Sequence, residues 1–371
     1  MKKMIASKVY FTDFHVKTND SLLKKIERLV KAAGIENIKM EKKFVAVKTH
    51  FGEYGNLAFI RPNYSRVIAD LVKKSGGIPF LTDCNTLYVG SRKHALEHID
   101  TAYLNGFTPM TTGCNIIIAD GLKGSDDIEI PINGEYIKNA KIGRAIYDSD
   151  IIITLSHFKC HELTGFGGAL KNLGMGCASR RGKMEQHSAS KPTFMIDLCK
   201  GCGKCLEACG SDAISLNDKK AHLNLNKCVG CGMCISRCVF DAIFAKIDQS
   251  NEILCKKMAE YAAAAIINKP NFHISLITDV SPFCDCHSDN DVPVVEDIGI
   301  LASFDPVALD MACADLVNEQ PISLNSYAHL NNKKYKDVFK CAQPTTDWHV
   351  TLEHAEKMGI GTKKYKLVKV K

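Results

Sequence analysis

Eight of the seventeen cysteines have a spacing that suits iron–sulfur clusters. They form two sets with C-x2-C-x2-C-x3-C spacing, 29 residues apart: Cys199, Cys202, Cys205 and Cys209, then Cys228, Cys231, Cys234 and Cys238. At this spacing three cysteines bind one cluster and the fourth reaches across to the other. We therefore predict two [4Fe–4S] clusters, one on the first three cysteines plus Cys238 and the other on Cys209 with the remaining three. Paired zinc sites are the alternative, but they use two-plus-two spacing.

The segments around these cysteines form an internal repeat. Residues 199–216 align with residues 228–245, with the cysteines, two glycines and Asp-Ala-Ile in register. The paired glycines are expected to let the backbone curl around a cluster and to aim N–H groups at its sulfurs. The pattern resembles bacterial two-cluster ferredoxins, and this resemblance implies one-electron transfer.

A second run contains residue types that could bind a ligand or catalyse a reaction. It is "HFKCHELTGFGGALKNLGMG", residues 157–176, which follows a strand-like segment. Ligands bind at the carboxyl ends of strands in open α/β sheets. The glycines Gly165, Gly167 and Gly168 would form a loop whose N–H groups approach an anion, just before a helix that starts near Ala169. The run lacks the phosphate-loop pattern. His161 and His187 are candidate acid–base groups or metal ligands, and Lys171 is a candidate anion anchor or nucleophile. The alternative is a tight packing turn with solvated side chains.

The third candidate is "FCDCH", which follows another predicted strand. Cys284 and Cys286 could chelate an additional metal ion from a loop, together with His157 or His161. Two ordinary thiols are the alternative. Cys84 also follows a strand, so Cys84, His161 and Cys284 are expected to converge on one cavity mouth. The other cysteines have no spacing partner and are expected to be small buried residues. His94 and His98, four residues apart, are expected to lie on a solvated helix face.

Residues 157–183 and 281–312 resemble the DUF362 family of iron–sulfur-associated proteins of unassigned function. A more distant resemblance is to lactate racemase, which has a His-x-x-x-Gly-Phe-x-Gly-Gly-x-Lys run. That resemblance implies a catalytic role for His161, a cofactor-attachment role for Lys171 and a nickel-ligand role for His187. It also matches Arg61 with an Arg-Pro at a helix start, although the family's acidic pair before that Arg-Pro is absent.

The elements that must position these groups alternate between strands and helices. Strands are predicted at 43–49, 78–83, 115–120, 150–156, 272–280 and 297–303, with a basic edge strand in 363–371. Helices are predicted at 61–77, 91–106, 256–269 and 305–319, the last with Asp305 as N-cap. This alternation predicts an α/β fold with a mostly parallel sheet. An α/β body would span 1–190 and 251–371, interrupted by a small α+β ferredoxin-like domain at 191–250. The polar stretch 180–192 is expected to be the linker into that domain.

Composition limits the function classes. The 371 residues carry a formal charge of +7, which two clusters of about −2 each would lower to about +3. No nucleic-acid motif accompanies this charge. The apolar runs are of strand length, so we expect no membrane span, and the N-terminus does not resemble a signal peptide. Abundant cysteine in a chain of this length favours metal ligation in a reducing cytoplasm over disulfides.

Three functions stay open at this stage. The first is a redox enzyme in which electrons from the clusters reach a small anionic substrate or a metal near residues 165–171. The second is an electron carrier that has no substrate and docks to a redox partner protein. The third is a racemase-like enzyme with a cofactor tethered to Lys171. The sequence leaves open whether the chain is an enzyme, and it gives no oligomeric state.

Overall fold

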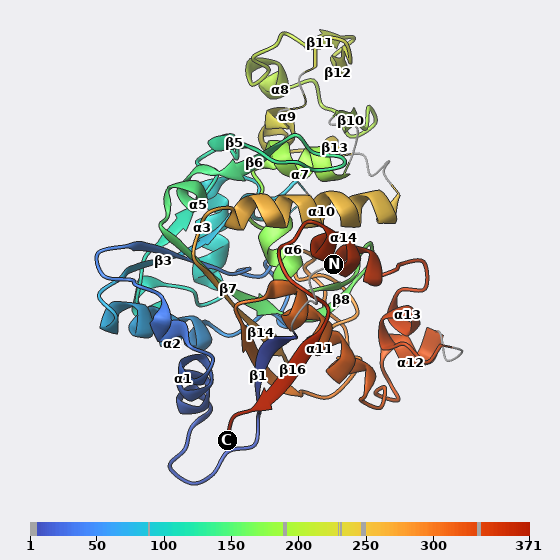
Figure 1. The fold of residues 1–371 in the computed structure, drawn as a ribbon. Coiled ribbons are helices and arrows are strands. Elements are labelled where there is room, and N and C mark those ends of the chain that lie inside the picture. Colours follow the sequence, from blue (N-terminus) through green and yellow to red (C-terminus); the bar gives the residue numbers. More distant parts are fainter. Residues whose placement is uncertain are drawn as a thin grey trace.

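A mixed eight-stranded sheet forms the centre of the computed structural model (Figure 1). The structure describes residues 6–87, 90–187, 191–228, 230, 232–245, 250–331 and 335–371. Across the sheet the strands are β16 (Tyr365–Lys369), β1 (Ser7–Asp13), β15 (Gly299–Ser303), β14 (Asn271–Ile277), β7 (Ile151–His157), β2 (Phe44–Lys48), β3 (Ile78–Asp83) and β4 (Ile116–Ile118). Every neighbouring pair is parallel except the two pairs that β15 makes. The predicted α/β fold, its strands and the basic edge strand are therefore confirmed.

Both faces of the central strands are covered, which explains why their sequences are continuously apolar. All seven residues of β7 are buried. Ile151, Ile153 and Leu155 pack into one core, whereas Ile152 packs into the other. Because successive side chains of a strand point to opposite faces, this alternation gives a three-layer arrangement with helices on each side.

The two helical layers differ in size. One contains α1 (Leu22–Ala32), η1 (Ile35–Asn37), α2 (Pro62–Lys74), α3 (Ala95–Leu104) and α4 (Pro109–Thr112). The other contains α5 (Arg144–Asp148), α6 (Ala169–Gly174), α10 (Asn251–Ile266), α11 (Pro306–Asn318), α12 (Tyr327–Asn331), α13 (Val338–Ala342) and α14 (His349–Lys357). Asp305 caps α11 as predicted, because its Oδ1 accepts from the N–H groups of Val307 and Ala308 at 2.9 Å.

Small antiparallel hairpins accompany the main sheet. In the body these are β5 (Asp127–Pro131) with β6 (Asn139–Gly143), and β8 (Lys159–His161) with β9 (Gly165–Gly167). Residues 191–245, hereafter the cysteine segment, contain β10 (Pro192–Phe194) paired with β13 (Ile243–Ala245), β11 (Ile214–Asn217) paired with β12 (Lys220–Leu223), α8 (Lys204–Glu207) and α9 (Met233–Arg237). This segment projects beyond α7 (Arg180–His187) and α10 at the top of Figure 1.

The prediction of a polar linker at 180–192 is wrong for its first eight residues. Residues Arg180–His187 form helix α7, and most of its side chains are buried despite their polarity. Their polar groups find partners inside the protein: Arg180 Nε donates to the carbonyl of Thr86, and Gln186 Nε2 donates to the carbonyl of Gly174. Among the described residues, no helix combines the length and the apolar character that crossing a membrane requires.

Candidate functional site

A cavity lies at the carboxyl ends of β2, β3 and β7 and encloses about 820 Å³ of empty space, counting its open mouth. Of the three residues expected to converge here, Cys84 and His161 line the cavity and Cys284 does not, but its neighbour Cys286 does. The loops after β3, β7 and β14 therefore meet at this mouth. Parallel strands place their carboxyl ends at the same sheet edge, so residues far apart in sequence meet here. The charged groups of the lining comprise five cations and one acid: Lys48, Arg92, Lys159, Lys171, Lys183 and Asp83.

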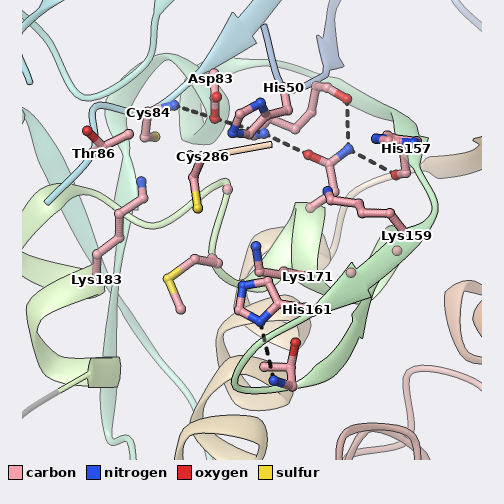
Figure 2. Close-up of a pocket in the computed structure, with 18 of the residues that line it drawn as sticks. His50, Asp83, Cys84, Thr86, His157, Lys159, His161, Lys171, Lys183 and Cys286 are labelled. Atoms are coloured by element: carbon pink, nitrogen blue, oxygen red, sulfur yellow. Dashed lines mark hydrogen bonds and ion pairs between the residues drawn. The ribbon is translucent and has the colours of Figure 1, made fainter. Parts of the chain in front are cut away.

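Three of the four predicted catalytic residues line this cavity: His161 comes from β8, Lys171 from α6 and His187 from α7. Figure 2 shows His161 and Lys171 among the lining side chains. His161 Nδ1 accepts from the backbone N–H groups of Leu163 at 3.1 Å and Thr164 at 3.3 Å. A neutral His161 therefore carries its proton on Nε2, which lies 3.5 Å from Glu162 Oε2. Burial lowers the pKa of His187 to about 3, so His187 is a neutral ring at ordinary pH.

Lys171 contacts the predicted thiol pair. Its Nζ donates to Cys284 Sγ at 3.2 Å, and Cys284 is fully buried. Burial opposes the charge on Lys171, but the neighbouring thiols Cys284 and Cys286 raise its pKa above the usual value. Lys171 is therefore a fixed cation in the cavity wall.

Asp285, between these cysteines, is a buried residue that sequence reasoning missed. Its oxygens lie 2.9 Å from His157 Nδ1 and 3.2 Å from Lys159 Nζ. Burial alone would raise the pKa of Asp285, but neighbouring His157 and Lys159 hold it well below the usual range. His157 Nε2 also lies 2.7 Å from the carbonyl oxygen of Thr278. Both ring nitrogens of His157 therefore face oxygen atoms.

A buried polar network from β2 and β3 forms another wall that was not predicted. Lys48 Nζ lies 2.9 Å from Asp83 Oδ1 and donates to Asn172 Oδ1 at 2.7 Å. Arg92 Nε pairs with Glu53 Oε2 at 2.9 Å. A charged residue at the end of an otherwise apolar strand, as in "FVAVK", is the signal that could have identified Lys48.

The prediction that His94 and His98 share a solvated face is also wrong. His98 is fully buried, stacks edge-on against Phe51 and lies 3.7 Å from Asp83. His94 is the N-cap of α3, where its Nδ1 accepts from the N–H of Glu97.

The N-terminus of the helix that follows the glycine-rich run is occupied by a carboxylate of the chain itself. The N–H groups of Ala169 and Leu170 donate to the carboxylate of the chain's own Asp310, at 2.7 and 2.8 Å. Gly168 is the position where this carboxylate approaches the backbone, since a Cβ there would overlap Asp310 Oδ1. A Cβ on Gly165 would lie 2.7 Å from Cβ of Trp348. Of the three glycines, Gly167 and Gly168 line the cavity and Gly165 does not.

Arg61 does not join this group. It is an exposed residue at the N-cap of α2, and it does not line the cavity.

The cysteine segment has a smaller cavity of about 330 Å³ of empty space. The cysteines that line it are the four predicted to share one cluster: Cys199, Cys202, Cys205 and Cys238. Cys231 lies outside the described residues. Among the residues that the structure describes, no three His, Cys, Asp or Glu side chains are arranged to hold a single metal ion.

Backbone donors in the cysteine segment fit cluster-binding sulfurs. The N–H groups of Ala221, Ala213, Gly230 and Ala242 donate to the Sγ atoms of Cys199, Cys209, Cys228 and Cys238 at 3.3, 3.3, 3.4 and 3.3 Å, respectively. Such bonds stabilise thiolate ligands. The repeat is structural as well as sequential, since the glycines at equivalent positions all adopt left-handed conformations: Gly201 (φ 66°), Gly203 (78°), Gly230 (70°) and Gly232 (68°).

Helix α7 joins the cysteine segment to the larger cavity. Lys183 and His187 line the cavity, whereas Met184 packs in a cluster with Cys205, Cys234 and Cys238. Leu87 joins the same cluster, one residue after Thr86 in the cavity wall. Helix α7 therefore contributes residues both to the larger cavity and to the hydrophobic cluster around these cysteines.

Comparison with known proteins covers both sites. Residues 45–315 match the model of the family described as "Domain of unknown function (DUF362)". The chain belongs to the DUF362 family. The matched range includes the cavity residues from the strand ends and all eight repeat cysteines. No curated protein matches the chain.

Two solved structures are similar to this DUF362 chain at low identity. One is the lactate racemase apoprotein from Thermoanaerobacterium thermosaccharolyticum, with 13% identity, a TM-score of 0.35, and coverage of 74% of this chain and 51% of that one. The other is a structural genomics target from Thermotoga maritima, with 12% identity, a TM-score of 0.35, and coverage of 90% and 58%. This chain thus spans little more than half the length of either, and the function is argued below from the site itself.

Proposed function

We propose that the protein is an iron–sulfur redox enzyme. The eight repeat cysteines would hold two [4Fe–4S] clusters, and the cavity at the sheet edge would bind a small anionic substrate. When bound, such clusters supply one-electron transfer. A redox partner protein would be the external source or acceptor of electrons.

The observation that carries this proposal is that helix α7 contributes to both sites. Met184 of α7 belongs to one hydrophobic cluster with Cys205 and Cys234, and Lys183, one residue earlier, lines the cavity. The ion pair between Lys93 and Asp241, at 2.8 Å, also ties the body to the cysteine segment. A redox centre and a substrate that must exchange electrons require this kind of proximity.

The cavity residues suit a small anion that gains or loses protons. Lys171 and Lys183 would bind its negative charge; Lys183 Nζ donates to the carbonyl of Ala178, and Lys171 contacts Cys284. His161 would hold a proton at Nε2, the nitrogen that its backbone hydrogen bonds leave for other partners. Burial would raise the pKa of Glu162, but neighbouring His161 and a hydrogen bond from His287 lower it to about 2, so Glu162 is an anion beside that proton.

An electron carrier without a substrate is the competing function. A carrier needs no enclosed, cation-lined cavity behind its clusters, and this cavity is what favours an enzyme. The two functions differ in whether small anions bind near Lys171.

Anaerobic preparation followed by anion titration tests the proposal. We expect about eight irons per chain. Titrations with acetate, malonate and inorganic phosphate should detect binding of at least one anion. Lys171→Gln should weaken that binding about ten- to a hundredfold, because a buried charged hydrogen bond contributes roughly 1.5–3 kcal/mol.

The exposed residue Lys39 provides a matched control, since Lys39→Gln removes the same charge away from the cavity. It should leave anion affinity unchanged. Equal affinities in wild type and Lys171→Gln, with iron retained, would favour the carrier function. Absence of iron from anaerobically prepared protein would refute the redox proposal altogether.

A further inference from the structure

The turn at residues 284–287 is anchored to the body at Cys284 and Asp285. The N–H of His287 donates to the carbonyl of Cys284 at 3.1 Å and closes the turn. Cys284 N donates to Glu162 Oε1 at 3.3 Å, and the carbonyl of Asp285 accepts from Glu53 N at 2.9 Å. The carboxylate of Asp285 is itself held by His157 Nδ1 and Lys159 Nζ. The two cysteines of this turn are therefore held in a fixed relation.

The two thiols of the turn lie in contact but in different surroundings. Their side chains interact, and this interaction lowers the pKa of Cys284 and raises the pKa of Cys286. Cys284 is fully buried with Lys171 Nζ at 3.2 Å, whereas Cys286 lines the cavity. The turn is closed between Cys284 and His287, so the two cysteines are held on one turn with only Asp285 between them.

The surroundings of Cys284 fit a thiol pair better than a metal site. An ammonium group that donates to Cys284 Sγ competes with a metal cation for the same lone pair and repels its charge. No third metal-binding side chain is suitably placed around the pair within the described part of the chain. These observations favour thiol chemistry over the additional metal ion predicted for Cys284 and Cys286.

We propose that Cys284 and Cys286 are a redox-active pair that cycles between dithiol and disulfide by exchange with a low-molecular-weight disulfide bound in the cavity. The cationic lining selects a ligand that carries carboxylates. This inference uses the same cavity as the proposed function but does not depend on the clusters. In this proposal Cys286 attacks the ligand's disulfide first, and Cys284 then resolves the mixed disulfide.

The exchange balances in two steps. Cys286 Sγ attacks one sulfur of the ligand, the ligand's S–S bond breaks, and the first thiol leaves with the proton of Cys286. Cys284 Sγ then attacks Cys286 Sγ, and the second thiol leaves with the proton of Cys284. Two electrons pass to the ligand and one intramolecular disulfide forms. Exchange with two thiols reverses both steps. Lys171 stabilises the thiolate form of Cys284, which is the form that makes this second attack.

Anaerobic exposure of the full chain to oxidised glutathione tests the pair. After quenching, the protein is denatured, free thiols are alkylated, and peptides are mapped by mass spectrometry. Wild type should carry a Cys284–Cys286 disulfide. Cys284→Ser should instead retain glutathione on Cys286, because the completing thiol is missing. Cys313, a buried thiol of α11, should be alkylated in both and serves as the internal control.

Two comparisons separate the role of the cavity from general thiol reactivity. Lys171→Gln should slow disulfide formation about tenfold, while Lys39→Gln should not change the rate. Uncharged 2-hydroxyethyl disulfide should react about tenfold more slowly than oxidised glutathione. Equal rates with the two disulfides would overturn the anionic ligand class.

Three outcomes would overturn the pair itself. One is wild type with both thiols alkylated after exposure. Another is Lys171→Gln with an unchanged rate. The last is stoichiometric Zn²⁺ binding by wild type that Cys284→Ser abolishes, which would assign a metal site. Iron content, measured on the same samples, reports on the proposed function separately, since the turn lies outside residues 199–238.

Discussion

Gly168 shows at the residue scale what the glycine-rich run accommodates. The sequence suggested clearance for a ligand, but the space next to Gly168 is occupied by the carboxylate of Asp310 and, 2.9 Å from an added Cβ, by the ring of Phe158. Asp310 lies 142 residues away in the sequence, so no local pattern could reveal it. Glycine identifies a close approach, but it does not identify what approaches.

Gly168→Ala should therefore destabilise the fold. The added methyl would displace Asp310 from the N–H groups of Ala169 and Leu170, and overpacking of this kind costs about 1–3 kcal/mol. Urea unfolding measures the loss. Gly210→Ala is a useful control because no atom lies within 4 Å of its added Cβ, and it should unfold like wild type. Equal stability of the two variants would contradict this account.

The carboxyl group of Asp310 should make stability depend on pH. Burial raises its pKa to about 7, although the two backbone donors favour the charged form. An unfolded chain releases this proton near pH 4, so between pH 4 and 7 the folded state binds more protons. The free energy of unfolding therefore falls as the pH rises through this range.

Asp310→Asn removes this dependence. The stability advantage of wild type over Asp310→Asn should narrow by about 1–2 kcal/mol between pH 5.5 and pH 7, and should stay constant above pH 7.5. Urea unfolding of both proteins at several pH values measures it. Parallel pH profiles would mean that the folded-state pKa of Asp310 is ordinary.

At the scale of elements, helix α7 is where local sequence was least informative. Strands such as β7 and helices such as α2 were predictable because their apolar residues follow a strand or helix pattern. "RRGKMEQH" has almost no apolar residue, which is typical of an exposed segment. It is buried because its polar groups meet backbone carbonyls and a cavity instead of water. Those partners come from distant parts of the chain, so a single sequence cannot show them.

Met184 is the residue of α7 that should connect stability with iron retention. Met184→Ala would leave a void beside Cys205, Cys234 and Cys238, and such truncations cost about 2–5 kcal/mol. We expect faster loss of iron on dilution under anaerobic conditions, followed by absorbance. Met184→Leu conserves the volume and should behave like wild type to within about 1.5 kcal/mol. Unchanged iron loss in Met184→Ala would show that α7 does not support the cysteine segment.

At the scale of the whole molecule, the sequence predicted which strand ends carry chemistry but not how their side chains pair. The loops after β3, β7 and β14 were expected to converge, and they do. The Lys48–Asp83 pair and the Asp285 network depend on the register of strands more than 30 residues apart, which one sequence does not contain. The predicted cysteine partnership across the repeat needed no such register, because the spacing alone implies it.

The predicted sharing of each cluster between cysteines of both repeats leads to a prediction about the iron content of the whole protein. Cys199 and Cys238 line one cavity although 39 residues separate them, so they should serve the same cluster. Cys199→Ala and Cys238→Ala should each leave about four of about eight irons per chain, and the double variant should also leave about four, because effects on one shared site do not add. Cys199→Ala combined with Cys228→Ala removes a ligand from each cluster and should leave almost none. Iron and protein assays on anaerobic samples measure all four variants. Loss of all iron in the double variant of Cys199 and Cys238 would place these cysteines on different clusters and reverse the assignment.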